Sequence, residues 1–301
     1  MSPNKSTPKP ATGNEPLLRV EHLSKYFPRG RTRFAAVQDV SVELKAGETL
    51  GIVGESGSGK STLSRSIIRL YEPDEGKVYF DGVDFTALSP NALREKRKDI
   101  QMIFQDPLAS LNPMMTVAGA IEDPLIIHNV STARERAKRV QELLELVGLD
   151  PAAANAFPFE FSGGQQQRIG IARALALNPK LLICDEAVSA LDVSIQAQIL
   201  RLLQDLQEQL GLAYLFISHN LAVVEHMSDV IGVMHTGKLV EYGSTEEIFS
   251  APKQEYTRTL IESVPYIPRP GGRHVRQPRL ETTSTATANL PPASLSENTR
   301  G

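Results

Sequence analysis

The sequence predicts an α/β fold in which a parallel sheet is covered on both faces. It also predicts an antiparallel β layer before the sheet and a helical subdomain inserted into it. In the second half of the chain, short apolar strands alternate with helices, which is typical of a parallel sheet with two buried faces. Near the start, β-compatible runs follow one another, and between these regions apolar residues recur at helical spacing.

The β layer is predicted from two runs, LLRVEHLSKYF (17–27) and FAAVQDVSVEL (34–44). They lead into a buried strand, ETLGIVG (48–54), and the turn signals PRG and KAG separate the three runs. A helix is expected from Lys60, and EPDEGKVYFDG (72–82) after it predicts a turn and an antiparallel strand.

The helical subdomain is expected over about 107–169. Within it, TARERAKRVQELLELVG predicts an amphipathic helix that ends at Gly148, because a glycine just past the last apolar residue is a common helix stop. The apolar positions at three- and four-residue spacing are Ala137, Val140, Leu143, Leu144 and Val147.

The parallel sheet is predicted from two apolar strands, KLLICDE (180–186) and AYLFISH (213–219). The helix GQQQRIGIARALAL (164–177) precedes the first strand, and a helix from Asp192 joins the two. The apolar face of this second helix comprises Ile195, Ile199, Leu202, Leu203 and Leu206.

Composition indicates a globular protein without the excess of basic residues that nucleic-acid binding usually needs. Of 301 residues, 41% are hydrophobic and 22% charged, and the formal net charge of -3 argues against a protein that neutralises phosphate backbones. A single cysteine, Cys184, excludes an internal disulfide framework or a cysteine-held metal cluster, and in its apolar strand we expect it to be core.

The two ends, 1–16 and 267–301, are predicted to be flexible tails because they are rich in Pro, Ser, Thr and Asn. No run approaches the roughly 18 apolar residues that cross a bilayer, and no secretory signal is apparent. We therefore expect a cytosolic chain whose membrane attachment comes through a partner.

GESGSGKS (54–61) matches the phosphate-binding pattern GxxxxGK[ST], between a buried strand and a helix. In this pattern, backbone N–H groups surround a polyphosphate, the lysine approaches the outer phosphates and the last hydroxyl ligates Mg²⁺. The alternative is a glycine-rich turn without a ligand. The ATP-binding residues predicted here are Gly54, Glu55, Ser56, Gly57, Ser58, Gly59, Lys60, Ser61 and Thr62.

LLICDE (181–186) is an apolar strand that ends in two carboxylates. In a nucleotide site, Asp185 would hold Mg²⁺, and Glu186 is the candidate that orients the attacking water. Alone, most such strings are better explained as an ordinary buried strand that ends in acidic turn residues. The phosphate loop upstream favours the Mg-nucleotide interpretation.

FSGGQQQRIGIARAL (161–175) resembles the signature motif of the ABC transporter ATPases. Its first residues form an anion site at a helix N-terminus, although SGG also fits a plain helix cap. The resemblance implies a RecA-like P-loop ATPase core, and it implies that the signature residues Ser162, Gly163, Gly164 and Gln165 serve the ATP of a partner subunit.

The same resemblance assigns four further residues, in family order. Gln105 resembles the Q-loop residue, a Mg²⁺ ligand and catalytic residue, Asp192 the D-loop and His219 the switch histidine, so the catalytic set is Lys60, Gln105, Glu186 and His219. The implied Mg²⁺ ligands are Ser61, Gln105 and Asp185. Phe27 matches the aromatic that stacks on adenine, with Tyr26 as a substitute, although an aromatic here also fits β-layer core.

Within this family, about residues 17–265 resemble the ATPase subunits of oligopeptide/dipeptide importers, with an ATPase domain over 17–250 and a C-terminal extension over 251–266. Ala187, Gln166 and Phe159 depart from frequent family residues but only neighbour the chemistry. A cysteine cluster that some subunits carry near the C-terminus is absent, which favours a heterodimer over a homodimer.

The resemblance implies an ATPase that couples ATP binding and hydrolysis to solute uptake at the cytoplasmic face of the inner membrane. Its implied partners are a second ATPase subunit, two permease subunits and, indirectly, a periplasmic or extracellular solute-binding protein, with no nucleic acid. The alternative is an ABC-type ATPase acting on DNA or ribosomes. It is disfavoured because no long coiled coil and no second ATPase half are present.

Overall fold

The computed structural model describes residues 15–30 and 32–263. The predicted tails lie outside these residues apart from Glu15 and Pro16, and both stay predictions. The division of the chain into an ATPase domain over 17–250 and an extension over 251–266 also stays a prediction.

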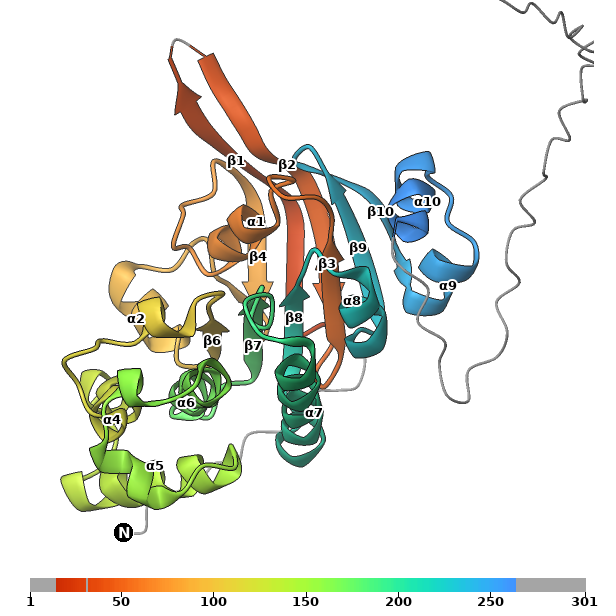
Figure 1. The fold of residues 1–301 in the computed structure, drawn as a ribbon. Helices are drawn as coiled ribbons and strands as arrows, with labels where there is room; N and C mark the ends of the chain where they lie inside the picture. Colours follow the sequence, from red (N-terminus) through yellow and green to blue (C-terminus); the bar gives the residue numbers. More distant parts are fainter. Residues whose placement is uncertain (1–14, 31, 264–301) are drawn as a thin grey trace, which may run out of the picture. The chain divides into compact units, whose positions relative to one another are not determined.

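A central sheet has the strand order β10-β9-β3-β8-β7-β6 within the described residues (Figure 1). Strand β10 is antiparallel to β9, whereas the other neighbours are parallel. The predicted parallel sheet is therefore confirmed. The strands are β3 (Thr49–Val53), β6 (Ile100–Ile103), β7 (Leu181–Asp185), β8 (Ala213–Ile217), β9 (Val230–His235) and β10 (Lys238–Ser244).

The central sheet separates two hydrophobic cores, because successive side chains of a strand point to opposite faces. On β7, Leu181 and Ile183 belong to the core shared with the antiparallel layer, and Leu182 and Cys184 belong to the core shared with the later helices. All four side chains are fully buried, which explains why this strand is apolar throughout rather than alternating.

The antiparallel layer is confirmed as a second sheet with the order β2-β1-β4-β5. Helix α1 (Lys60–Ile67) begins at the predicted residue and contributes Leu63 and Ile67 to the core beneath this layer. The strands are β1 (Leu18–Arg29), β2 (Thr32–Leu44), β4 (Glu75–Phe80) and β5 (Val83–Asp84).

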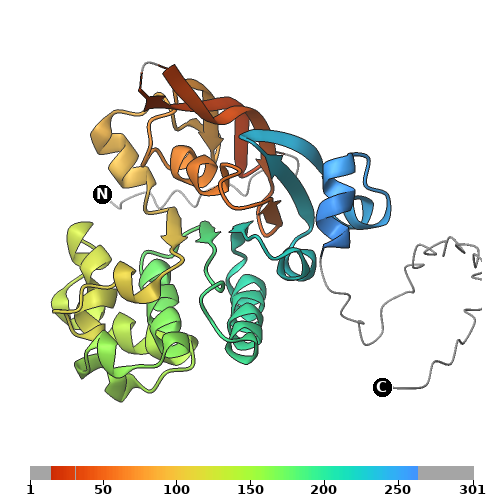
Figure 2. The same cartoon turned by 45° about the horizontal axis from the view of Figure 1, so that its top comes forward.

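Helices alone occupy the stretch between β6 and β7, and both views show them gathered away from β1 and β2 (Figures 1 and 2). They are α3 (Pro107–Ser110), α4 (Val117–Ile127), α5 (Ala133–Leu146) and α6 (Gly163–Leu175), with 3-10 turns at Pro151–Asn155 and Pro158–Glu160. Helix α2 (Pro90–Lys96) precedes β6.

Helix α5 is followed by Gly148 at φ +72°, where the sequence predicts the helix end. The structure adds a Thr132–Glu135 capping box at its start. Its core face is shorter than predicted. Val140, Leu143 and Leu144 are buried, but Ala137 is exposed because the helix reaches the core only from Val140 onward.

The remaining helices are α7 (Val193–Leu210), α8 (Leu221–Met227), α9 (Thr245–Ser250) and α10 (Glu255–Glu262). In both views α9 and α10, in blue, lie beside the end of the sheet that holds β10 (Figures 1 and 2). Among the described residues, no helix combines the length and the apolar character that crossing a membrane requires.

Candidate active site

The predicted site segments follow the carboxyl ends of four neighbouring strands. The loop 54–61 follows β3, His219 follows β8, Asp185 ends β7 and Gln105 follows β6. These strands are parallel and adjacent in the order β3-β8-β7-β6. Carboxyl ends of parallel strands meet at one edge of the sheet, which is where α/β proteins bind ligands, so chain positions far apart come to one place.

The loop 54–61 takes a conformation that favours glycine at Gly54, Gly57 and Gly59, and at Gly54 and Gly59 a side chain would also clash. Gly54 has φ +148° and Gly59 has φ +103°, values that other residues rarely adopt. A Cβ on Gly54 would lie 2.1 Å from the Met234 carbonyl oxygen, and one on Gly59 would lie 2.2 Å from the Ala36 carbonyl oxygen. The neighbouring strands therefore press directly on the loop backbone.

Lys60 is 4% exposed and opens helix α1. Its Nζ donates to the carbonyl oxygens of Gly54 at 2.7 Å and Glu55 at 2.8 Å. Burial lowers the pKa of Lys60 below its usual value, and the nearby carboxylates of Glu186 and Asp185 oppose that shift. A buried ammonium is thus held at the loop by carbonyl dipoles and by the two acids at and just after the end of β7.

Ser61 and Asp185 are joined directly, because Ser61 Oγ donates to Asp185 Oδ1 at 2.7 Å. Arg65 Nη2 lies 3.5 Å from Asp185 Oδ2. Burial raises the pKa of Asp185, while the Ser61 hydrogen bond and the Arg65 charge act against that rise. Arg65 was missed by the sequence analysis, although its place four residues after Ser61 on one helix was a usable signal.

A hydroxyl and a carboxylate in contact form the oxygen donor set that Mg²⁺ prefers, so Ser61 and Asp185 fit the predicted metal ligands. Gln105 is exposed in the bend after β6. Within the described residues it makes no hydrogen bond to Ser61 or Asp185, and its roles as ligand and catalytic residue stay predictions.

Glu186 and His219 form a second pair, with Glu186 Oε1 3.3 Å from His219 Nδ1. Glu186 adopts φ +52°, an unfavourable left-handed conformation for a residue with a side chain. Its N–H donates to the Ile217 carbonyl at 2.9 Å, and Ser189 Oγ donates to its carbonyl at 2.9 Å. These bonds fix a strained backbone that directs the carboxyl group, and such strain is common at functional sites.

Cys184 is fully buried next to these acids, and burial raises the pKa of its thiol to about 12. The thiol is therefore protonated at neutral pH, and the predicted role of Cys184 as core is confirmed.

The predicted signature residues begin helix α6, and Ser162 is its N-cap. Ser162 Oγ accepts the Gln165 N–H, and Gln165 Oε1 accepts the Ser162 N–H, which forms a capping box. The helix-cap alternative is thus realised. Ser162 and Gly163 are nevertheless exposed at the positive end of this helix, so an anion site remains compatible with the cap.

Gly164 is required by packing, since a Cβ there would lie 2.5 Å from Ile195 Cγ2 on α7. In the described part of the chain, no hydrogen bond joins Ser162, Gly163, Gly164 or Gln165 to the loop 54–61. Asp192 is exposed at the N-cap of α7, where the sequence predicts the helix to begin, and its side chain makes no cap hydrogen bond.

Phe27 is half-buried on β1 and meets Tyr71 edge-on at 5.4 Å between ring centres. Tyr71 Oη lies 3.4 Å from Arg65 Nη1, which links Phe27 through Arg65 to Asp185. Tyr26 is also half-buried, with its N–H donated to Asp74. The role of either ring toward adenine stays a prediction.

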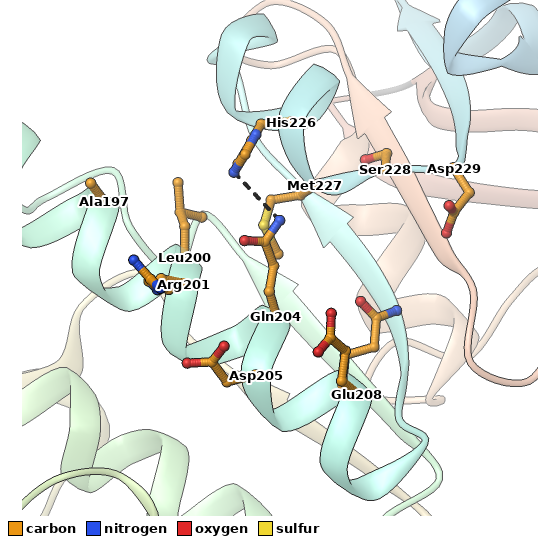
Figure 3. Close-up of a pocket in the computed structure, with 11 residues that line it drawn as sticks. Ala197, Leu200, Arg201, Gln204, Asp205, Glu208, His226, Met227, Ser228 and Asp229 are labelled. Carbon is orange, nitrogen blue, oxygen red and sulfur yellow. Dashed lines mark hydrogen bonds between the residues drawn. The ribbon is translucent and has the colours of Figure 1, made fainter. Parts of the chain in front are cut away.

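A hollow of about 690 Å³ lies elsewhere, between α7 and the segment from α8 to β9 (Figure 3). Its lining includes Arg201, Gln204 and His226, and Gln204 Nε2 lies 3.4 Å from His226 Nε2. None of the predicted site residues lines it. Among the described residues, no group of three or more His, Cys, Asp or Glu is placed to hold a metal ion.

Two contacts to the loop had no signal in the local sequence. Gly237 donates its N–H to the Ser58 carbonyl at 2.9 Å. Tyr256 Oη, on helix α10, accepts the Glu55 N–H at 3.2 Å.

Comparison with known families gives two matches. Residues 37–189 match the family model described as ABC transporter. Residues 240–290 match the one described as oligopeptide/dipeptide transporter, C-terminal region.

Among curated relatives, the chain is 54% identical over 263 residues to the oligopeptide transport ATP-binding protein AppF of Bacillus subtilis, which covers 85% of this chain and 80% of AppF. It is 51% identical over 258 residues to the glutathione import ATP-binding protein GsiA of Pectobacterium atrosepticum, covering 83% of this chain and 41% of GsiA. A solved dimeric post-hydrolysis state of the ATP-binding cassette MJ0796, bound to ADP and Pi, superposes with a TM-score of 0.69 at 33% identity over 76% of this chain and 98% of that chain.

Proposed function

This chain belongs to the ATP-hydrolysing subunits of ABC transporters, and from that premise we propose that it powers import of oligopeptides, dipeptides or related small solutes. The observation that carries the ATP hydrolysis in this proposal is the hydrogen bond between Ser61 and Asp185, with Lys60 and Glu186 beside it. It gathers a phosphate loop and a strand-end acid pair at one edge of the sheet, as ATP hydrolysis requires.

In the proposed reaction, the loop N–H groups and the Lys60 ammonium bind the outer phosphates of ATP. Ser61 and Asp185, with Gln105, would hold Mg²⁺, which neutralises charge on the phosphates when bound. Glu186 orients the attacking water and accepts its proton, and His219 holds the Glu186 carboxyl group through the contact at 3.3 Å.

We propose that two such subunits close over two ATP molecules, and that the Ser162 to Gln165 segment of each completes the site of the other. The exposed Asp192 and the adjacent Val193, which is 83% exposed, support a protein interface at the start of α7. We favour a heterodimer with a different ATPase subunit over a homodimer.

The proposed contact with two permease subunits lies on the helical subdomain and the loop from Gln105 to Val117. Met114 is 85% exposed in this loop, and the exposed rings of Phe157 and Phe159 stack at 5.6 Å. Arg173 of α6 donates to the Ser110 carbonyl and so ties this loop to the signature helix. A permease bound to this loop would therefore contact the segment that follows Gln105 and, through Arg173, the signature helix α6. The chain would then sit at the cytoplasmic face of the inner membrane, and a solute-binding protein would act through the permeases.

Transport is favoured over action on DNA or ribosomes by the match of residues 240–290 to a transporter C-terminal region and by the import relatives. Peptides are proposed as cargo from the same match. Glutathione is a second candidate, because GsiA is 51% identical over the aligned residues.

The proposal is tested by purifying the tagged chain from detergent-solubilised membranes of its own cells. We expect it to bring down two polytopic membrane proteins and a second ATPase subunit, and a strain lacking it should lose uptake of labelled peptides. Recovery without membrane proteins would contradict the attachment, and loss of glutathione uptake alone would replace peptides by the second candidate.

A further inference from the structure

Helix α10 contacts the phosphate loop through one side chain. Tyr256 Oη accepts the backbone N–H of Glu55 at 3.2 Å, across 201 positions of sequence. The ring of Tyr256 stacks on His235 at the end of β9, with ring centres 4.0 Å apart and planes at 17°. The tyrosine is thus held by a strand end on one side while its hydroxyl touches the loop.

Helix α10 is itself fixed to the sheet by Glu241 of β10. The Glu241 carboxylate, 9% exposed, accepts the N–H of Lys253 at 2.7 Å and of Gln254 at 3.1 Å, just before the first turn of α10. Burial opposes ionisation of Glu241, yet the Lys253 N–H, the Thr257 hydroxyl and the Gln254 N–H together hold the pKa of Glu241 below its usual value. A charged, hydrogen-bonded anchor therefore sets the position of Tyr256.

On the other side of the contact, Glu55 is bonded to the catalytic lysine. Its carbonyl oxygen accepts from Lys60 Nζ at 2.8 Å and from the Ser58 N–H at 3.2 Å. One residue, Glu55, therefore joins Tyr256 at its N–H and Lys60 at its carbonyl. The peptide group between Gly54 and Glu55 carries both contacts, because its N–H donates to Tyr256 and its carbonyl oxygen, that of Gly54, accepts from Lys60 Nζ at 2.7 Å. A rotation of this peptide plane would therefore move an acceptor of the ammonium that binds phosphate.

The loop has little freedom to compensate on this side. The Met234 carbonyl lies against Gly54, and the Gly237 N–H bonds the Ser58 carbonyl at 2.9 Å. These contacts and Tyr256 support the loop from the side of β9 and β10, whereas Ser61 bonds Asp185 at the end of β7.

We propose that Tyr256 is a positioning residue for the phosphate loop, through which the C-terminal helix contributes to ATP affinity. The inference rests on the proposed function, in which this loop binds the phosphates of ATP. Tyr256 touches neither Glu186 nor His219 among the described contacts, so its effect falls on nucleotide binding rather than on the chemical step. Helix α10 lies within residues 240–290, which match the oligopeptide/dipeptide transporter C-terminal region.

The test compares Tyr256→Phe with a matched control, Tyr242→Phe. Tyr256→Phe removes the hydroxyl and keeps the stack on His235. Tyr242 donates to the Glu43 carbonyl at 2.9 Å and accepts the Glu43 N–H at 3.5 Å, so its variant also loses tyrosine hydroxyl bonds to backbone, but away from the loop. Losing one such bond predicts a three- to tenfold higher Kd and KM for Mg-ATP in Tyr256→Phe, with kcat within about twofold. Faster hydrogen exchange is expected in a peptide that spans Glu55, and Tyr242→Phe should change none of these.

His235→Leu is a second variant that disturbs the same tyrosine from β9, and it should shift KM in the same direction. Unchanged KM and unchanged exchange in both variants would overturn the inference, as would a fall in kcat alone. A third variant, Lys60→Ala, distinguishes failure of the proposed function from failure of the proposed role of Tyr256. Retained ATP binding in Lys60→Ala refutes the proposed function, whereas lost binding there with normal Tyr256→Phe refutes only the role of Tyr256.

Discussion

Ser61 Oγ donates to Asp185 Oδ1 at 2.7 Å, a hydrogen bond that joins the start of α1 to the end of β7 across 124 positions of sequence. Two motifs that the sequence shows only as separate strings therefore form one unit. Asp185 is buried in that unit, and burial is the largest influence on its pKa, which is raised. Ionisation of Asp185 therefore lowers the free energy of unfolding.

Asp185→Asn should therefore stabilise the protein while it destroys activity. The folded state binds the Asp185 proton more tightly than the unfolded chain, so above the ordinary value of 3.8 the free energy of unfolding falls as pH rises toward the folded pKa. Asparagine is uncharged and keeps the Ser61 acceptor. At pH 7 we expect a melting temperature higher by about 2–4 °C for each kcal/mol recovered, and a turnover at least about a hundredfold lower.

Thermal denaturation at pH 7 and at pH 4 checks this prediction, because the gain should shrink at the lower pH. Asp205→Asn changes an exposed acid on α7 and serves as the control. A lower melting temperature for Asp185→Asn at pH 7 would show that the carboxylate stabilises the fold instead.

Glu186→Gln should keep ATP binding and reduce turnover by roughly a hundredfold or more. The amide retains the size of the side chain and loses the proton acceptor. Steady-state ATPase rates and nucleotide affinity are measured together, with Glu208→Gln on the exposed face of α7 as control. Normal turnover in an assembled transporter would remove Glu186 from the catalytic set.

Two substitutions of Ser162 distinguish its role as the cap of helix α6 from its proposed role in binding the partner's ATP. Asparagine and aspartate are both good N-caps, so Ser162→Asn and Ser162→Asp should have similar melting temperatures. Aspartate adds a negative charge where we propose that the partner's ATP phosphates bind. We expect the aspartate variant to turn over ATP at least tenfold more slowly than the asparagine variant in the assembled dimer. Equal ATP turnover in the two variants would contradict the anion-binding role and leave Ser162 only as the helix cap.

Deleting residues 275–301 should leave ATPase activity intact, because the composition of this segment predicts a flexible tail. The rate of the truncated chain is compared with that of the full chain at equal concentration. A large loss of rate would assign this segment an ordered or regulatory part.

The local motifs were predictable from sequence because each depends on neighbours in the chain. The loop 54–61 needs glycines at fixed spacing, and the apolar run 181–184 needs burial on both faces of a sheet. The long-range partners were not predictable. Tyr256 reaches Glu55 only because α10 is anchored on β10, and nothing near residue 256 in the sequence marks that contact.

The sequence pattern also failed to predict the contacts that residues make at the ends of helices. Ala137 has the correct spacing and is exposed, since α5 meets its core only from Val140. Asp192 is a favoured cap residue whose side chain makes no cap bond. In both cases tertiary contacts, rather than local preference, decide the outcome.

The most direct test of the account is ATP-driven uptake of a labelled oligopeptide by right-side-out membrane vesicles that carry the assembled transporter. With wild-type chain we expect uptake that depends on internal ATP, and with Glu186→Gln we expect uptake near background at normal levels of assembled complex. Uptake by the Glu186→Gln vesicles at the wild-type rate would contradict the claim that this chain's ATP hydrolysis drives transport.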